Sequence, residues 1–173
     1  MKLTPVMEKF ILHWGEMGSR WGINRSVAQV HALLMLCPKP IAADEIGETL
    51  SVARSNVSTS IKELQGWGLI RVVHIFGDRR EHFETMKDVW EMFIVVMKER
   101  KKREFDPTLA TLRDCKQAAV GAKEDSDHTR ARLKELIEFM ELTSSWADKA
   151  QSMSPASAKK LFKLGDKVFR LVG

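Results

Sequence analysis

The sequence predicts a mainly α-helical protein with a small β-hairpin, and two adjoining stretches carry that prediction. Between Ala42 and Gly68, apolar residues recur at helical spacing in two short segments separated by a polar break. The stretch that follows, 69–85, holds β-branched and apolar residues on both sides of a Gly-Asp turn, which is typical of a hairpin. Helix, turn, helix and hairpin in this order form a winged helix-turn-helix. We expect it within 1–86, followed by a helical region at 87–173.

The composition is that of an ordinary folded protein. Hydrophobic residues make up 44% of the 173 and charged residues 29%, which is enough apolar material for one compact domain or two small ones. No apolar run approaches the length of a membrane span, and two cysteines, Cys37 and Cys115, do not make a disulfide framework. We therefore expect a cytoplasmic protein without a membrane partner.

The positive charge of the chain is not concentrated where a nucleic acid would be read. The net charge is +5, but residues 1–85 hold 10 Lys and Arg against 9 Asp and Glu. A nucleic-acid function therefore depends on where single cations lie and not on the bulk charge.

Two helices are expected before the helix-turn-helix. Thr4 and Pro5 suit the N-cap and first turn of a helix with one continuous apolar stripe, formed by Val6, Phe10, Trp14, Met17 and Trp21. Gly15 and Gly18 lie among these residues, and such glycines favour close packing against another helix. Asn24 is the expected N-cap of a second helix over 25–37, which Pro38 ends.

The helix-turn-helix, at about 42–67, supplies the main candidate site. We expect a first helix at 42–50 and Ser51 as the N-cap of the second. The second helix places Val57, Ile61 and Leu64 on one apolar stripe. Its other faces are small and polar, as close approach to base edges and phosphates requires. The residues that we predict to contact DNA there are Arg54, Ser55, Asn56, Ser58, Thr59 and Lys62. Gly66 and Gly68 end this helix around Trp67.

The hairpin, or wing, is expected to pair strands at 69–76 and 80–84 around the turn Gly77-Asp78-Arg79. Arg79 and Arg80 are the candidate DNA contacts of the wing, although a simple solvated turn is the alternative. A hairpin centred on Asp78 would place His74 opposite His82. Paired histidines are potential zinc ligands, but no third ligand is evident, and we expect no metal site.

The second half is expected to be helical throughout. A stripe from Val89 to Met97 leads into a basic run, Lys98–Arg103, for which a solvated face is favoured over a supplementary phosphate contact. Asp106-Pro107 suggests that one helix stops and another begins, and 121–128 suggests a polar linker. Further apolar stripes include Leu133, Leu136, Ile137, Phe139, Met140, Leu142 and Trp146, and then Leu161, Phe162, Leu164, Val168 and Phe169 after Ser154-Pro155. These helices are too apolar to be solvated alone, so they pack on each other or on a second chain.

The sequence gives no sign of an enzyme. It has no Gly-rich phosphate loop, no nucleophile elbow, no paired carboxylates in an apolar setting and no Cys-x-x-Cys. We expect no catalytic residue and no cofactor.

Several stretches resemble the MarR superfamily of bacterial transcription regulators, in particular its GbsR-like branch. They are ARSNVS in the second helix of the helix-turn-helix, ELQGWGLI after it, GDRREHF in the wing, and FILHWGEMGSRWGINRSVAQVHALL near the start. The resemblance covers about residues 7–103. It implies a sequence-specific DNA-binding regulator, by family habit a repressor, which dimerises through its N- and C-terminal helices. It also implies that a wing arginine enters the minor groove and is steadied by an adjacent aspartate, which Arg79 and Asp78 match. The alternative is a winged-helix module that binds protein instead of DNA.

The same resemblance suggests that a small-molecule effector controls the protein, since choline sensing is reported for the namesake of the branch. Trp14 and Trp21 share a helix face, seven residues apart. Core packing is the expected role of these rings. The alternative is a cage for a quaternary ammonium effector through cation–π attraction, with Trp14 and Trp21 as its candidates.

Overall fold

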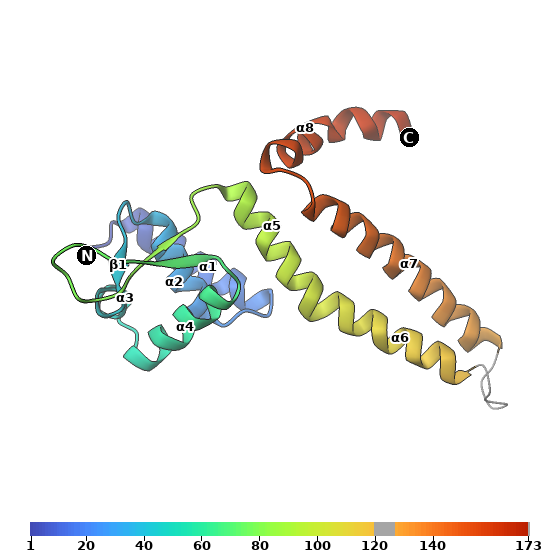
Figure 1. Cartoon of the computed structure of the whole chain (residues 1–173), viewed down its shortest axis with the longest axis horizontal. Coiled ribbons are helices and arrows are strands. Elements are labelled where there is room, and N and C mark those ends of the chain that lie inside the picture. Colours follow the sequence, from blue (N-terminus) through green and yellow to red (C-terminus); the bar gives the residue numbers. More distant parts are fainter. Residues whose placement is uncertain (120–126, 173) are drawn as a thin grey trace. The chain divides into compact units, whose positions relative to one another are not determined.

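The computed structural model describes residues 1–119 and 127–172, with the backbone alone for residue 162 and residues 166–172. The protein is mainly helical with one three-stranded antiparallel sheet (Figure 1). It divides into two compact units, Met1–Met92 and Phe93–Gly173. The elements are α1 Pro5–Arg20, α2 Arg25–Leu36, β1 Ile41–Ala42, α3 Ala43–Leu50, α4 Arg54–Gly66, β2 Ile70–Val73, β3 His82–Thr85, α5 Val89–Arg100, the π-helical segment η1 Lys101–Phe105, α6 Asp106–Ala119, α7 Asp127–Gln151 and α8 Pro155–Val172.

Helix α1 packs closely on α2 through its glycines. The N-cap is Thr4, whose hydroxyl accepts a hydrogen bond from the Met7 amide at 3.3 Å, and Pro5 occupies the first turn, as expected. Gly18 is buried, and a Cβ placed on it would lie 2.5 Å from the Ala28 Cβ. The prediction of close helix packing at these glycines is therefore confirmed.

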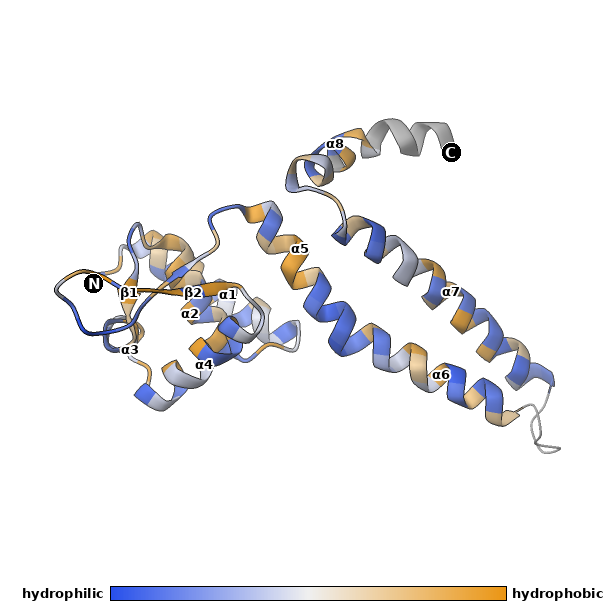
Figure 2. Cartoon of the chain, viewed as in Figure 1, coloured by the Kyte–Doolittle hydropathy of each residue, from blue (hydrophilic) through white to orange (hydrophobic). Residues whose placement is uncertain are grey.

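Helix α2 lies at the centre of the first unit. It contacts α1, α3, α4 and β3, and its N-cap is Asn24, whose side chain accepts from the Ser26 amide at 2.8 Å. Val30 and Leu33 of α2, Ile46 of α3 and Val57 of α4 are completely buried. Figure 2 shows the apolar residues of this unit concentrated on α2 and the sheet. The core thus holds α3 and α4 in the helix-turn-helix arrangement.

The sheet has one strand more than the sequence suggested. Its order is β1-β3-β2, and β1, a two-residue strand before α3, pairs with β3 through Ile41 and Phe83. A strand of two residues is too short to show the alternation of apolar and polar side chains that marks a strand, which is why it was not predicted. It attaches the wing directly to the start of the helix-turn-helix.

One continuous helical run extends through α5, η1 and α6, so the predicted break at Asp106-Pro107 is wrong. Both Arg100 and Asp106 have right-handed helical backbone angles, and the Asp106 amide donates to the Lys101 carbonyl, five residues back. Pro107 has no N–H, and in a regular α-helix its ring would clash with the carbonyl of Arg103. The wider π-turn relieves that clash without ending the helix.

The core of the second unit is formed between α6 and α7. Leu109, Ile137 and Met140 are buried together, with Phe105 and Leu112 packed against them. Helix α8 begins after Ser154, whose hydroxyl accepts from the Ser157 amide at 3.1 Å, as expected for a cap. The predicted linker at 121–128 and the Phe162, Val168 and Phe169 side chains lie, wholly or in part, outside what the structure describes. In the described residues no helix combines the length and hydrophobicity needed to cross a membrane.

Candidate nucleic-acid interface

Helix α4 has one buried and one polar exposed face, as its spacing predicted. Val57, Ile61 and Leu64 are buried against the core, together with Ser60. All six predicted contact residues are exposed: Arg54, Ser55, Asn56, Ser58, Thr59 and Lys62. Four of them are small, Ser55, Asn56, Ser58 and Thr59, and they leave the helix backbone accessible to a surface laid against it.

The turn before α4 differs from the expectation. Ser51 is the C-cap of α3, in the left-handed region with φ of 55°, and does not cap α4. The N-cap of α4 is Ala53, which has no side-chain oxygen to offer. The first amides of α4 therefore lack a side-chain acceptor at the cap position.

The wing and the start of α4 meet at one hollow. Arg54 from α4, Arg80 and Phe83 from the wing, and Asp44 from α3 line a depression of about 380 Å³. Elements far apart in the sequence thus bring two guanidinium groups to one surface, as contact with a phosphate backbone requires.

Arg80 is held by carboxylates from two elements. Its guanidinium pairs with Asp78 at 2.8 Å in the wing, and with Asp44 at 2.9 Å and Glu45 at 3.1 Å at the start of α3. The hydrogen bonds from Arg80 lower the pKa of Asp78 to about 2 and also lower the pKa of Asp44. The same hydrogen bonds raise the pKa of Arg80. These contacts tie the wing to the helix-turn-helix.

The expected pairing of Asp78 with Arg79 is therefore wrong, because Asp78 pairs with Arg80. Arg79 is exposed and has no ion pair or side-chain hydrogen bond among the described residues. Backbone geometry explains why Asp78 pairs with Arg80 and not with Arg79. Arg80 donates its own amide to Asp78 at 2.9 Å, and this turn brings the residue two positions after the aspartate over its carboxylate.

His82, at the root of the wing, is a structural group. His82 is buried; its Nδ1 lies 3.0 Å from the Arg80 carbonyl and its Nε2 lies 3.4 Å from Asp78. The strand register pairs His82 with Val73, so His74 does not lie opposite it and the predicted pair is wrong by one residue. Because side chains alternate along a strand, that shift sends the two rings to different environments. The described residues hold no group of three potential metal ligands.

His31 of α2 is the other buried imidazole. Its Nε2 lies 3.2 Å from the Thr85 hydroxyl, which donates to the Leu69 carbonyl at 3.0 Å. Burial lowers the pKa of His31 to about 4. A neutral imidazole thus links α2 to β3 and, through the Thr85 hydroxyl, to Leu69 just before β2.

The candidate effector rings of α1 form a row. Phe10 and Trp14 stack with centroids 5.4 Å apart, and Trp14 meets Trp21 edge-on at 6.4 Å. The row lies beside the glycine face of α1 and is not core, since Trp21 is 46% exposed. Phe10 and Trp14 are partly buried in this row.

The basic run Lys98–Arg103 is partly neutralised. Lys101 pairs with Asp106 at 2.8 Å and with Asp148 of α7 at 3.2 Å, and these carboxylates raise its pKa. Arg100 pairs with Glu104 at 3.1 Å. Lys98, Lys102 and Arg103 are exposed, as a solvated face requires, but the Lys101 side chain is only 16% exposed and its ion pairs give it a structural role that was not predicted.

Sequence reasoning missed two features of the wing. Asp44 and Glu45 were not predicted as partners of Arg80, because they are more than 30 residues away and no local pattern signals that contact. Phe76 was assigned to a strand, but its side chain lies at the tip of the wing and is fully exposed. The following Gly77 was a signal that the strand ends before it.

The region that forms this surface matches a known family. Residues 21–81 match the MarR family model, a range that begins after α1 and includes α2, the helix-turn-helix and most of the wing. A comparison with curated proteins found no match.

Solved structures include proteins of similar architecture. One, described as a transcriptional regulator, has 18% identity and a TM-score of 0.61, and the alignment covers 85% of this chain and 96% of that one. A MarR family regulator from Neisseria meningitidis has 22% identity and a TM-score of 0.37, over 77% of this chain and 87% of that one. The first of these comparisons shows a shared fold. The family match over 21–81 coincides with α2, the helix-turn-helix and most of the wing, so this part of the chain is similar to the MarR family.

Proposed function

We propose that this protein is a sequence-specific, DNA-binding repressor of the GbsR-like branch of the MarR superfamily. The observation that carries the proposal is the face of α4, where Ser55, Asn56 and Thr59 are exposed opposite a fully packed apolar stripe. A helix face that only meets water commonly carries charged residues in alternation. Small hydroxyl and amide side chains instead suit direct contact with base edges in the major groove.

The basic residues of α4 and the wing would make the other contacts with DNA. Arg54 and the uncapped amides of the first turn of α4 would bind phosphate at the groove edge, and Lys62 would do so further along the helix. Arg79, unpaired among the described residues, would enter the neighbouring minor groove. Arg80, which was predicted as a DNA contact, would instead position the wing, because its guanidinium is bound by Asp78, Asp44 and Glu45. As a regulator of transcription, the protein would act in the cytoplasm and block a promoter by occupying it.

The proposal includes a homodimer formed through the region 87–173. Helix α7 has a second apolar stripe, on the side away from its buried residues. The side chains of this stripe are 43% to 64% exposed and comprise Leu136, Phe139, Leu142 and Trp146. So much exposed apolar surface on one helix is unusual for a monomer. Two copies joined by a two-fold axis would present two α4 helices to major grooves about 34 Å apart.

The periodicity of α7 makes Met140 a candidate for the same interface, but Met140 is buried within the chain against Leu109 and Ile137 and is therefore not part of it. A charge at Phe139 is the appropriate perturbation. Phe139→Glu should lower the mass measured by sedimentation equilibrium from that of a dimer to that of a monomer, and DNA affinity should fall with it. A wild-type protein that stays monomeric at micromolar concentration, yet binds its site tightly, would refute the dimer.

A small-molecule effector is the last part of the proposal. The row of Phe10, Trp14 and Trp21 is its candidate site, since aromatic faces attract quaternary ammonium groups. Choline titrated against tryptophan fluorescence, in wild type and Trp14→Leu, tests this part separately from DNA binding. Identical responses of the two proteins would remove the candidate.

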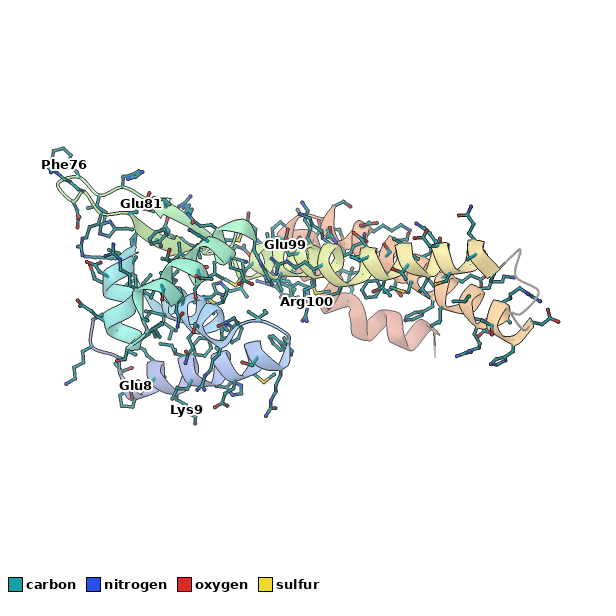
Figure 3. The ribbon with its side chains drawn as sticks, turned by 90° about the horizontal axis from the view of Figure 1, so that it is seen from below. Glu8, Lys9, Phe76, Glu81, Glu99 and Arg100 are labelled. Atoms are coloured by element: carbon teal, nitrogen blue, oxygen red, sulfur yellow. The ribbon has the colours of Figure 1, made fainter. Side chains whose placement is uncertain are left out.

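Selection of bound sequences from a random DNA pool, followed by a salt titration on the selected site, tests the main proposal. We expect an enriched sequence and a steep decrease of log affinity with log salt. Lys62→Ala should reduce that slope by roughly one unit. Lys9→Ala, a change on α1 away from the wing (Figure 3), should leave the slope unchanged. No enriched sequence and no salt-dependent DNA binding would indicate a protein-binding module.

A further inference from the structure

The tip of the wing presents one aromatic ring entirely to solvent. Phe76 is 107% exposed, the highest exposure among the large hydrophobic side chains of the described residues. Figure 3 shows it at the end of the hairpin loop, pointing away from the rest of the unit. Contact with an apolar surface removes an exposed aromatic side chain from water and is therefore favourable in free energy.

The backbone holds this ring in a defined position. The Asp78 amide donates to the Ile75 carbonyl at 3.0 Å, which closes a tight turn with Phe76 and Gly77 at its centre. Gly77 has φ of 86°, whereas Phe76 has no positive φ, and this combination defines a type II turn. Phe76 thus occupies the first corner of a hydrogen-bonded turn, so its burial by a partner costs side-chain rotamer freedom but little backbone entropy.

The base of the turn is also braced. Asp78 follows the turn directly and binds Arg80, which in turn binds Asp44 and Glu45 of α3. His82 adds contacts to the Arg80 carbonyl and to Asp78. The position of the tip relative to the helix-turn-helix is therefore fixed by side chains from both elements.

The charge beside the ring favours DNA as the partner. Arg80 is shared among Asp78, Asp44 and Glu45, so the cation that remains available beside the ring is Arg79, which is exposed and unpaired among the described residues. An apolar ring next to a free guanidinium on a projecting turn matches the way in which proteins enter the minor groove, where apolar wedges part base steps and cations meet the phosphates. Ile75 is 40% exposed, and the two side chains alone make a small apolar area for a protein interface.

We propose that Phe76 is an apolar wedge that enters the DNA minor groove beside Arg79 and partly unstacks one base step. The wedge rests on the proposed DNA-binding function and adds to it a second mode of sequence selection. A step that unstacks easily, such as TA or CA, binds the ring at lower cost than a stiff one. The wing would then favour flexible steps in the sequence that flanks the site read by α4.

The test uses the full chain and the DNA site selected from a random pool, with 2-aminopurine placed in turn at each step of the flank. The fluorescence of this base rises when it is unstacked. Wild type should raise the emission at one flanking step. Phe76→Ser should abolish that rise and weaken binding roughly tenfold or more. Phe76→Leu, which keeps an apolar side chain, should retain most of both effects.

Ile75→Ser is the matched control, because it makes the same kind of change one residue away. It should keep the emission rise and lose little affinity. Thermal unfolding should be unchanged in each variant, since neither side chain packs in the core. Unchanged affinity and emission in Phe76→Ser would overturn the wedge while leaving the DNA-binding function in place, and the ring would then be available to a protein partner. Equal losses in Ile75→Ser and Phe76→Ser would also overturn it. A wild-type protein that selects no DNA sequence would overturn both proposals.

Discussion

Replacement of Gly18 by alanine should destabilise the first unit, although alanine is the better helix former. A Cβ on Gly18 would lie 2.5 Å from the Cβ of Ala28, which belongs to α2. Real atoms do not approach so closely, and Ala28 has no flexible side chain that could move aside. The two helices must therefore separate, in a region where α1 makes its main contacts.

Two opposing terms set the size of the effect. Overpacking of this kind lowers the free energy of unfolding by about 1–3 kcal/mol. The higher helix propensity of alanine raises it by up to about 1 kcal/mol. We expect a net loss of roughly 1–2 kcal/mol in the free energy of unfolding, measured by urea titration with circular dichroism as the signal.

Two further glycines provide the controls. A Cβ on Gly15 would meet the Gln29 Cγ at 2.7 Å, but that side chain is long and can move, so Gly15→Ala should cost less. A Cβ on Gly66, at the end of α4, meets nothing within 4 Å. Gly66→Ala should therefore be neutral or stabilising by up to about 1 kcal/mol. If Gly18→Ala is as stable as Gly66→Ala, the close packing of α1 on α2 is wrong.

Three other predictions concern pH, the core of the second unit and the wing. The pKa of His31 is about 4 when folded and 6.5 when exposed, so full stability is present above pH 6.5. As pH falls from 6.5 towards 4, the unfolded chain binds a proton at His31 that the folded protein excludes. The free energy of unfolding therefore decreases by up to about 1.4 kcal/mol per pH unit. Urea titrations at pH 7, 6 and 5 should show a flatter dependence for His31→Gln; an equal slope would contradict this. Met140→Ala should lower the free energy of unfolding by about 2–5 kcal/mol in urea titration. Phe139→Ala, measured on dilute monomer, should change it by no more than about 0.5 kcal/mol. Equal losses in the two variants would contradict the description of α7 as a helix with one buried and one exposed apolar face. Arg79→Ala should weaken binding more for DNA with A·T-rich flanks, as measured by fluorescence anisotropy, and unchanged affinity would remove Arg79 from the interface.

The parts of the fold that the sequence predicted are those with local causes. The spacing of Val57, Ile61 and Leu64 defines the buried face of α4, and side-chain caps such as Thr4 and Asn24 define helix starts. Exposure of the candidate DNA contacts then follows, because those residues occupy the other faces of the same helix. A polar helix face can thus be inferred before any tertiary structure is known.

The missed features depend on contacts between distant residues or on geometry that one residue can alter. The pairing of Arg80 with Asp44 joins residues 36 positions apart. A shift of one residue in the hairpin register separates His82 from His74. Helical periodicity marked both Met140 and Phe139 as apolar, but only the position of α6 determines which of them is buried. Periodicity identifies faces, and packing decides which face meets a partner.

The central claim is that α4 reads bases, and one comparison tests it most directly. Affinities of wild type, Asn56→Ala and Gln65→Ala should be measured on the selected site and on random DNA at one salt concentration. Asn56 is exposed in the first turn of α4, and Gln65 is an exposed amide in its last turn. The account predicts that Asn56→Ala loses about 1–3 kcal/mol on the selected site and much less on random DNA, while Gln65→Ala changes neither appreciably. Equal losses for Asn56→Ala on both DNAs, or equal wild-type affinity for both, would contradict base reading by α4.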